Sequence, residues 1–227
     1  MIPALLITGP ATGAGKTLIT RALAAALHAR GRIVAALKPV ETGVDPFAED
    51  ALALARAAGD PSLASAAGFH RAKPALAPYA VQLEGHAAAP DLPAIIAQIR
   101  ALAVTADVLL VEGAGGLLAP FDAHHDCTDL ARQLELPLLL VARDQLGVLS
   151  HVLTCFESAR TRALPVAAVI LSRHQPGDPD PSLRTNQRIL QERLACPVVT
   201  FPATPDDDRA LADTAERLGL IELLALG

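Results

Sequence analysis

Residues 4–17 read ALLITGPATGAGKT: an apolar run, a glycine-rich turn and a Lys-Thr pair. The apolar run is typical of a short buried strand. Apolar residues then recur at helical spacing, at Leu18, Ile19, Leu23 and Leu27. A strand, a glycine loop, Lys-Thr and a helix in this order predict a phosphate-binding loop. Glycines let backbone N–H groups converge on phosphate oxygens, and the helix N-terminus adds the positive end of its dipole.

Two residues of this loop carry predicted chemistry. Lys16 would bind the β- and γ-phosphates of a nucleoside triphosphate, and the Thr17 hydroxyl would ligate Mg²⁺. The usual pattern has glycine where Pro10 stands, and Gly9 comes one residue earlier, so we expect a loop one residue longer. An ordinary strand–turn–helix corner is the alternative. The predicted nucleotide contacts in this segment are Gly13, Ala14, Gly15, Lys16, Thr17 and Leu18.

Composition limits the class of protein. The chain has 227 residues, 52% of them hydrophobic, so we expect one domain over residues 1–227 with a real core. Aromatic residues make up 3%, which predicts an aliphatic core. A net charge of −5 argues against a nucleic-acid partner.

Sequence features also bear on the compartment. Three cysteines without a close pair suit reduced thiols. The N-terminus has no basic region before its short apolar run, which argues against a signal peptide. No apolar run reaches the ~20 residues of a membrane span. We therefore expect a cytoplasmic protein without a membrane partner.

Apolar runs alternate with helical patterns along the rest of the chain. Further strands are expected at 32–37, 107–111, 138–141, 166–171 and 197–200. Helices are expected at 50–56, 92–102, 128–134, 147–160, 182–194 and 209–218. Residues 41–46 and most of 59–93 are typical of loops. The alternation predicts an α/β fold, a mostly parallel sheet with helices on both faces in a Rossmann-like three-layer arrangement, with its ligand beyond the carboxyl ends of the strands.

Charged residues directly follow two of the predicted strands. Lys38 and Glu112 would lie at the same sheet edge as the phosphate loop. Glu112 stands where many phosphate-loop proteins have a metal-binding Asp, and Lys38 would add positive charge near the γ-phosphate. The alternatives are a solvated strand end for Glu112 and a surface lysine for Lys38. Asp50 has two possible roles, as a metal ligand and as the N-cap of its helix, and one residue can fill both.

Three further motifs bear on function. Residues 113–116, Gly-Ala-Gly-Gly, indicate backbone that passes close to a ligand, with a flexible turn as the alternative. Residues 124–127, His-His-Asp-Cys, resemble a metal cluster, but four consecutive residues cannot all face one ion, so we expect no metal there. Ser150 lacks the glycine framing of a nucleophile elbow. The residues alone therefore predict an Mg²⁺–nucleoside triphosphate enzyme or switch.

From Leu6 to about Arg217 the chain resembles the dethiobiotin synthase family of phosphate-loop NTPases. The matching stretches are the long loop 9–17, KPVETG at 38–43, DALAL at 50–54, VEGAGGL at 111–117 and LGVLSH at 146–151. The first and fourth are shared with related amide-forming ATPases. Residues 38–43 together with Asp50 are more diagnostic, and the family also has the longer loop.

The resemblance implies a ligase of biotin biosynthesis. One amine of 7,8-diaminononanoate takes up CO₂ as a carbamate, the carbamate oxygen attacks the γ-phosphate of ATP, and the second amine closes the ureido ring with loss of phosphate. On matching positions, Lys16 and Lys38 would be catalytic. The other implied roles are metal ligands at Thr17, Asp50 and Glu112; diamine contacts at Thr12 and Thr42; substrate-carboxylate contacts from a partner subunit at Gly147 and Ser150; and nucleotide contacts at Asp50, Glu112, Gly113, Ala114, Gly115, Ser172, Arg173 and Pro202.

Several positions depart from the family pattern. Ala11 stands where an aspartate is common, and Gly13 where many members have a larger side chain. Ser150 replaces an asparagine that reads the substrate tail, and Ser172-Arg173 replaces an Asn-Asp pair that reads adenine. We expect an intact phosphoryl-transfer apparatus but weaker discrimination among bases, because Arg offers only hydrogen-bond donors.

The helix expected at 147–160 carries an apolar stripe of Val148, Leu149, Val152, Leu153 and Phe156. One interpretation places this stripe in the chain's own core. The resemblance implies the other, a homodimer in which the start of this helix reaches the partner's substrate.

Two alternatives come from other classes of protein. A nucleotide switch of the partitioning kind carries a lysine five residues before the loop lysine, where Ala11 stands. A metallochaperone usually has a His-rich tract, and only His124-His125 is present. An amide ligase of the cobyrinic acid a,c-diamide synthase type needs a glutaminase domain, for which 227 residues leave no room.

Overall fold

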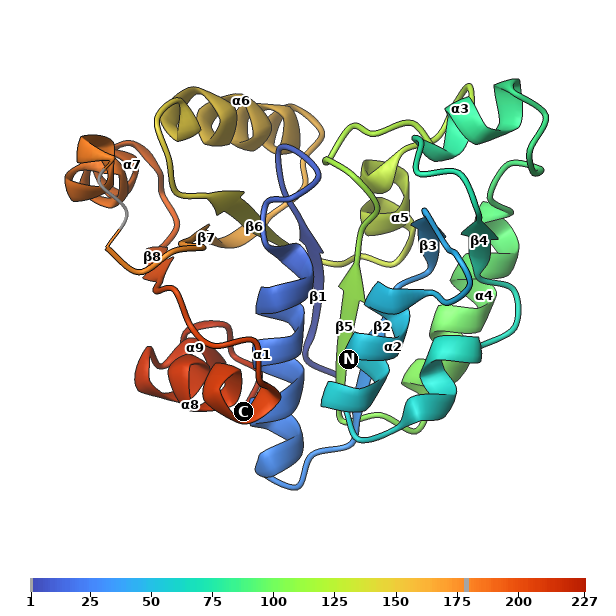
Figure 1. Ribbon diagram of the computed structural model, residues 1–227, viewed down its shortest axis with the longest axis horizontal. Coiled ribbons are helices and arrows are strands. Elements are labelled where there is room, and N and C mark those ends of the chain that lie inside the picture. The colour runs from blue at the N-terminus through green and yellow to red at the C-terminus, as the bar shows by residue number, and fades with distance from the viewer. Residues whose placement is uncertain (1, 178–179) are drawn as a thin grey trace.

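The computed structural model describes residues 2–177 and 180–227 (Figure 1). Its main sheet has six strands in the order β2-β5-β1-β6-β7-β8, and every pair of neighbours is parallel. The strands are β1 Ala4–Thr8, β2 Val34–Leu37, β5 Val108–Glu112, β6 Leu138–Arg143, β7 Val166–Ser172 and β8 Val198–Phe201. The predicted fold class, a mostly parallel sheet in an α/β protein, is confirmed.

Helices cover both faces of this sheet. On one face, α1 packs against α2, α8 and α9, and Figure 1 shows α1 in front of β1. The other face carries α4, α5, α6 and α7, as right-handed crossovers between parallel strands require. The helices are α1 Lys16–Ala29, α2 Glu49–Ala57, α4 Leu92–Ala103, α5 Cys127–Gln133, α6 Val148–Thr161, α7 Asn186–Arg193, α8 Asp208–Arg217 and α9 Leu220–Leu223.

The core is aliphatic, as the composition predicted. All five residues of β5 are buried, because parallel strands have helices on both sides. On α1, Leu23 and Leu27 are fully buried, each contributing about 1.5–3 kcal/mol. Ala22 and Ala26 are buried on the same helix, which packs closely against α8. The first helix is thereby held firmly behind the phosphate loop.

Two short strands lie where the sequence predicted loop. β3 (Val40–Thr42) pairs in parallel with β4 (His70–Ala72) in a separate two-stranded sheet. The expectation of loop at 41–46 was therefore wrong at its start. Within the expected loop 59–93, the structure also has the 3₁₀ helix η1 (Pro61–Ser65) and α3 (Pro78–Leu83). Elements of three to six residues are too short to show a hydrophobic period, which is why the pattern missed them.

Two helical predictions near the C-terminus need correction. The helix expected at 182–194 is interrupted, because the 3₁₀ helix η2 (Pro181–Arg184) comes first and α7 begins only at Asn186. Between them, Thr185 leaves the helical region with φ −127°. The short α9 was not predicted at all; its N-terminus follows Gly219, which has a left-handed φ of 63°.

α1 and α6 each begin after a left-handed glycine, without a side-chain cap, at the carboxyl edge of the sheet. α1 follows Gly15 and α6 follows Gly147, both left-handed with φ of 95° and 92°. Their first N–H groups have no side-chain partner at the cap position, so both helix starts can offer donors to an anion. Other helices do carry local caps. Asp91, for example, accepts from the Ala94 N–H at the start of α4.

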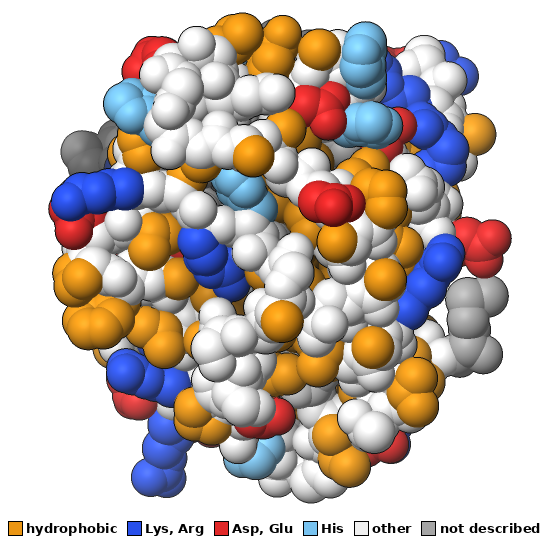
Figure 2. All heavy atoms as spheres, turned by 90° about the vertical axis from the view of Figure 1, so that its right-hand side faces the viewer, with side chains coloured by type: hydrophobic (Ala, Val, Ile, Leu, Met, Phe, Trp, Pro, Cys, Tyr) orange, Lys and Arg blue, Asp and Glu red, His pale blue; other side chains and the backbone are white. Residues whose placement is uncertain are grey.

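On the side formed by α3 and α4, positive and negative side chains are mixed and form no large patch of one sign. Figure 2 shows Lys and Arg side chains scattered there among acidic, histidine and hydrophobic ones. No helix within residues 2–177 and 180–227 is long and apolar enough to cross a membrane.

The Asp91 cap gives a measurable prediction for stability. Asp91→Ala removes the acceptor of the Ala94 N–H, and we expect the free energy of unfolding to fall by about 1 kcal/mol. Urea unfolding followed by circular dichroism measures this. Asp60→Ala, which removes the cap of the short helix η1, is the comparison and should cost less, because η1 buries one residue, Leu63, whereas α4 buries four. Unchanged stability in Asp91→Ala would mean that α4 is held by packing alone.

Candidate functional site

A cleft of about 370 Å³ lies at the carboxyl ends of β1, β2 and β5. It is bordered by the loop between β1 and α1, by β3 and by the start of α2. The predicted site residues that line it are Thr12, Gly13, Gly15, Lys16, Thr17, Leu18, Lys38, Thr42, Asp50, Glu112, Ala114 and Gly115. The fold therefore brings together predicted residues that are more than a hundred positions apart in the chain.

The phosphate loop is held by close backbone packing at two glycines. A Cβ on Gly9 would lie 2.0 Å from the carbonyl oxygen of Val141, so no larger residue fits where the loop leaves β1. A Cβ on Gly116 would lie 2.6 Å from the carbonyl oxygen of Pro10. The 113–116 segment was expected to pass close to a ligand. At Gly116 the close neighbour is instead the phosphate loop itself, whereas Ala114 and Gly115 do face the cleft.

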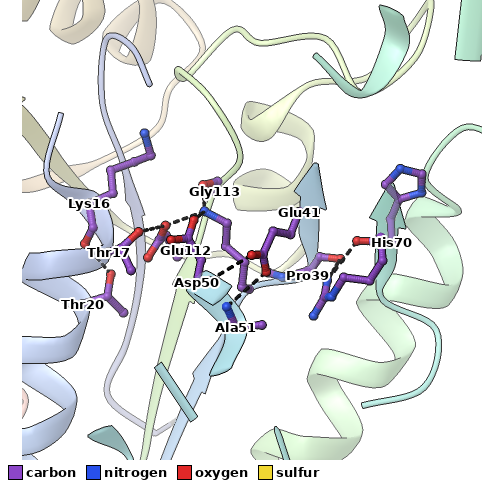
Figure 3. Close-up of polar contacts among 12 residues, drawn as sticks. Lys16, Thr17, Thr20, Pro39, Glu41, Asp50, Ala51, His70, Glu112 and Gly113 are labelled. Atoms are coloured by element: carbon purple, nitrogen blue, oxygen red, sulfur yellow. Dashed lines mark hydrogen bonds and ion pairs between the residues drawn. The ribbon is translucent and has the colours of Figure 1, made fainter. Parts of the chain in front are cut away.

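Lys38 lines the cleft and stands between two carboxylates, those of Glu112 and Asp50, which Figure 3 labels. Its ammonium donates to Glu112, lies 3.0 Å from an oxygen of Asp50, and is 3.3 Å from the Gly113 carbonyl. The Thr17 hydroxyl donates to the same Glu112 oxygen at 2.9 Å. Lys38 is 6% exposed and Glu112 is fully buried, so neither is the solvated surface residue of the alternative interpretation.

Lys16 extends back over its own loop. Its ammonium donates to the carbonyl of Ala11 at 2.9 Å, and the side chain is buried. Burial lowers the pKa of Lys16, and the nearby charge of Lys38 lowers it further. Burial also acts to lower the pKa of Lys38, but Glu112 and Asp50 outweigh it and hold that pKa above its usual value. Lys38 is therefore firmly cationic.

The oxygen atoms beside Lys38 suit a hard divalent cation. The second carboxylate oxygen of Glu112 is buried and has no hydrogen-bond partner among residues 2–177 and 180–227. Thr17 and Asp50 supply a hydroxyl and a second carboxylate on the same side of the cleft. Mg²⁺ takes few ligands from protein and fills its other positions with water and phosphate oxygens. The residues therefore fit the ion, although the described residues contain no cluster of three or more His, Cys, Asp or Glu side chains.

Asp50 is not the cap of its helix, so that interpretation was wrong. α2 begins at Glu49 after Ala48, and no side chain near its N-terminus caps it locally. The cap comes from Glu41 on β3, whose two carboxylate oxygens accept the N–H groups of Asp50 (2.9 Å) and Ala51 (3.1 Å). Burial raises the pKa of Glu41, although these two hydrogen bonds act to lower it. In the sequence, Glu41 stands out only as part of the KPVETG motif at 38–43, and its capping role was not predicted.

The predicted substrate residues divide into two groups. Thr12 and Thr42 line the cleft. Gly147 and Ser150 are exposed at the start of α6 and do not border it. The apolar stripe of α6 divides in the same way: Val148 and Val152 lie in the chain's own core, while Leu149, Leu153 and Phe156 are only partly buried.

The predicted base readers have other surroundings than the sequence suggested. Ser172 is fully buried behind the phosphate loop, and its hydroxyl has no partner among the described residues. Arg173 donates to Asp144 at 3.0 Å and to the carbonyl of Leu183 at 2.9 Å. His174, which the sequence argument did not single out, lines the cleft in their place. Pro202, half-buried after β8, does not line it.

Asp144 explains why Arg173 is fixed. It is buried at the end of β6, and it also accepts from the side-chain amide of Asn186 at 2.8 Å. Asp144 is buried between two exposed residues, Arg143 and Gln145, and no pattern in the sequence predicts this burial. The pair Arg173–Asp144 therefore links the ends of β6 and β7 to the start of α7.

The geometry defines the class of protein: a parallel α/β fold with a lysine-bearing glycine loop between β1 and α1 is a P-loop NTPase. Solved structures agree. The septum site-determining protein MinD complexed with Mg-ADP, from Pyrococcus horikoshii OT3, is similar with a TM-score of 0.56 and 19% identity, over 100% of this chain and 94% of that one. At that identity the likeness shows the fold alone.

Sequence relatives are more specific. The family model described as an AAA domain matches residues 3–206. The ATP-dependent dethiobiotin synthetase BioD of Caulobacter sp. (strain K31) is 42% identical over 175 residues, 75% of this chain and 76% of that protein. The protein of the same name from Anaeromyxobacter dehalogenans (strain 2CP-C) is 36% identical over 220 residues, 96% of each. The chain belongs to the dethiobiotin synthetase family within the AAA-domain proteins.

The placement of Arg173 gives a prediction that separates a structural role from base reading. Arg173→Met leaves the buried Asp144 without its charged partner, so we expect the free energy of unfolding to fall by about 2 kcal/mol, with the preference for ATP over GTP and CTP unchanged. Urea unfolding and nucleotide competition measure the two effects. Arg188→Met, on the exposed pair with Glu192, is the control and should be nearly neutral. Full stability with an altered base preference would instead make Arg173 a base reader.

Proposed function

We propose that the chain is an ATP-dependent dethiobiotin synthetase, a ligase of biotin biosynthesis acting as one domain, residues 1–227, in the cytoplasm. The reaction joins 7,8-diaminononanoate and CO₂ and converts ATP to ADP and phosphate. The observation that carries the proposal is the convergence of Lys16, Lys38, Thr17, Asp50 and Glu112 in one cleft at the phosphate loop. Family membership supports the same activity.

The proposed reaction has three steps. An amine of the substrate adds to CO₂, giving a carbamate and releasing a proton. A carbamate oxygen then attacks the γ-phosphorus of ATP, which forms a carbamic-phosphoric anhydride and breaks the bond to ADP. The second amine attacks the carbonyl carbon, closes the ureido ring and expels phosphate. Negative charge gathers on carbamate and phosphoryl oxygens in each step, so the site needs fixed positive charge.

The two buried lysines supply that charge. In this proposal Lys16 meets the β- and γ-phosphates, and Lys38 meets the carbamate and the transferring phosphoryl group. Both are largely removed from water, which strengthens their attraction for the developing charge. Glu112 and Asp50 already hold the Lys38 ammonium in place, so the side chain would need little movement to contact the reacting oxygens.

Thr17, Asp50 and Glu112 would hold Mg²⁺ in this proposal. When bound, the ion would neutralise charge on the phosphate oxygens of the nucleotide. The unpartnered oxygen of Glu112 and the half-exposed carboxylate of Asp50 are the groups available for it. Thr12, in the loop between β1 and α1, and Thr42, on β3, would contact the diamine end of the substrate.

The substrate carboxylate would be bound by a second copy of the chain. Gly147 and Ser150 lie outside their own cleft, and α6 begins with uncapped N–H groups that suit an anion. Beside them, Leu149, Leu153 and Phe156 are only partly buried, as expected of a helix that meets a partner. We propose a homodimer with two equivalent sites, each built from both chains.

The alternative, a nucleotide switch of the partitioning or metallochaperone type, shares the fold. Its supporting likeness is to structures such as MinD, where identity is 19% and only the fold is comparable. Relatives named dethiobiotin synthetase cover 96% of the chain at 36% identity. The scattered charges in Figure 2 and the net charge of −5 likewise support a small-molecule substrate over nucleic acid.

The direct test adds 7,8-diaminononanoate and bicarbonate to the protein with Mg²⁺ and ATP. We expect phosphate release to rise and dethiobiotin to form in equal amount, followed by a phosphate assay and mass spectrometry. Lys38→Ala should lower kcat by roughly 10²-fold or more, because its charge is aimed at the transition state. Lys73→Ala, an exposed lysine paired with Asp45, should leave kcat unchanged. ATP hydrolysis that ignores the diamine would reject the synthetase function.

The shared site can be tested by mixing two inactive variants. Lys38→Ala damages the site of its own chain, and Ser150→Asp places negative charge against the carboxylate bound by the partner. In a mixed dimer one site collects both changes and the other collects none. Random pairing should restore activity to about a quarter of wild type. Native mass spectrometry confirms the exchange, and no recovery after exchange would show that each chain builds its own site.

A further inference from the structure

Glu41 is buried at the border of the cleft and takes no part in the ligand contacts proposed above. Its side chain rises from β3 and ends at the start of α2 (Figure 3). One carboxylate oxygen accepts the N–H of Asp50 and the other accepts the N–H of Ala51. Glu41 is 7% exposed. Both of its oxygens are thus bound to backbone on another element.

These two hydrogen bonds replace a local cap. Ala48 precedes α2 and has no side-chain acceptor, so the first N–H groups of the helix depend on Glu41. A carboxylate is well suited to this place, because it accepts two donors at once and meets the positive end of the helix dipole. An amide at the same position offers only one oxygen, and its NH₂ group faces an N–H donor.

Asp50 depends on this arrangement for its position. Its side chain is 42% exposed, and the ion pair with Lys38 is its side-chain contact in the described residues. Its backbone N–H, by contrast, is held by Glu41 at 2.9 Å. If the first turn of α2 frayed, the Asp50 carboxylate would leave both Lys38 and the Glu112 side of the cleft. The same strand carries Thr42, which faces the cleft.

We propose that Glu41 is a positioning residue. It fixes the start of α2, so that the Asp50 carboxylate stays beside Lys38, where it can join Thr17 and Glu112 in binding a divalent cation. The identity of the cation site rests on the proposed function; the hydrogen bonds of Glu41 do not. Groups that hold a metal ligand in place typically change metal affinity by 10–100-fold when they are replaced. Replacing Glu41 should therefore lower the affinity for the divalent cation more than it lowers the stability of the fold.

The experiment measures Mn²⁺ binding to the full chain in the presence of ADP, by electron paramagnetic resonance of the free ion. Glu41→Gln should weaken Mn²⁺ binding by roughly 10-fold. Asp91→Ala is the matched control, since it removes the cap of α4 without reaching the cleft, and Mn²⁺ affinity should not change. Equal Mn²⁺ affinity in Glu41→Gln and wild type would overturn the proposal.

A double-variant cycle distinguishes positioning from a general loss of structure. Asp50→Asn alone should weaken Mn²⁺ binding, and adding Glu41→Gln to it should weaken binding little further, because the carboxylate that Glu41 positions is already gone. Independent, additive losses would show that Glu41 acts elsewhere. If circular dichroism shows that Glu41→Gln folds poorly, Glu41→Asp is used instead. Its side chain is one methylene shorter and cannot accept both N–H groups. Its Mn²⁺ affinity should lie between those of the wild type and Glu41→Gln.

The same data separate this proposal from the synthetase function. Mn²⁺ and ADP bind without the diamine, so the affinity change is expected whether or not 7,8-diaminononanoate stimulates ATP hydrolysis. Failure of the diamine assay with a weakened ion site in Glu41→Gln rejects the reaction and keeps the positioning role. The reverse result rejects the positioning role alone.

Discussion

The contact of Lys38 with Glu112 and Asp50 is the interaction on which the site depends. Glu112 is fully buried and Lys38 nearly so, and an unpaired charge in either place would be strongly destabilising. Each charge therefore requires the other. Because Lys38 follows β2, Glu112 ends β5 and Asp50 belongs to α2, their pairing fixes three elements relative to one another. It also keeps positive charge beside the phosphate loop before any nucleotide binds.

The order of the strands makes this contact possible. β5 lies between β1 and β2, so the phosphate loop, Glu112 and Lys38 follow three adjacent parallel strands and meet at one edge. The aliphatic core holds these strands in register over their full length. A site of this kind needs rigid placement of charge, and the buried strands supply it, while β3 and the start of α2 border the cleft beside them.

The sequence predicted what its local patterns encode. Long apolar runs identified the six main strands, and the glycine loop with Lys16 and Thr17 identified the sheet edge at which the cleft lies. It could not predict β3 and β4, which have three residues each and no visible period. It also could not predict contacts made between distant parts of the chain. The burial of Asp144 against Arg173, and the capping of α2 by Glu41 instead of by Asp50, arise only when separate elements pack together.

The choice of Glu41 over a local cap has a physical reason. A capping side chain at position 48 would tie the start of α2 only to its own approach, where residues 45–47 are exposed. Glu41 instead ties it to β3, which follows Lys38 by one residue, Pro39, and pairs with β4. The start of α2 is then held by the same stretch of backbone that carries the Lys38 side chain. Glu41 therefore fixes Asp50 relative to the backbone segment that begins at Lys38, and this holds the Asp50 carboxylate 3.0 Å from the Lys38 ammonium.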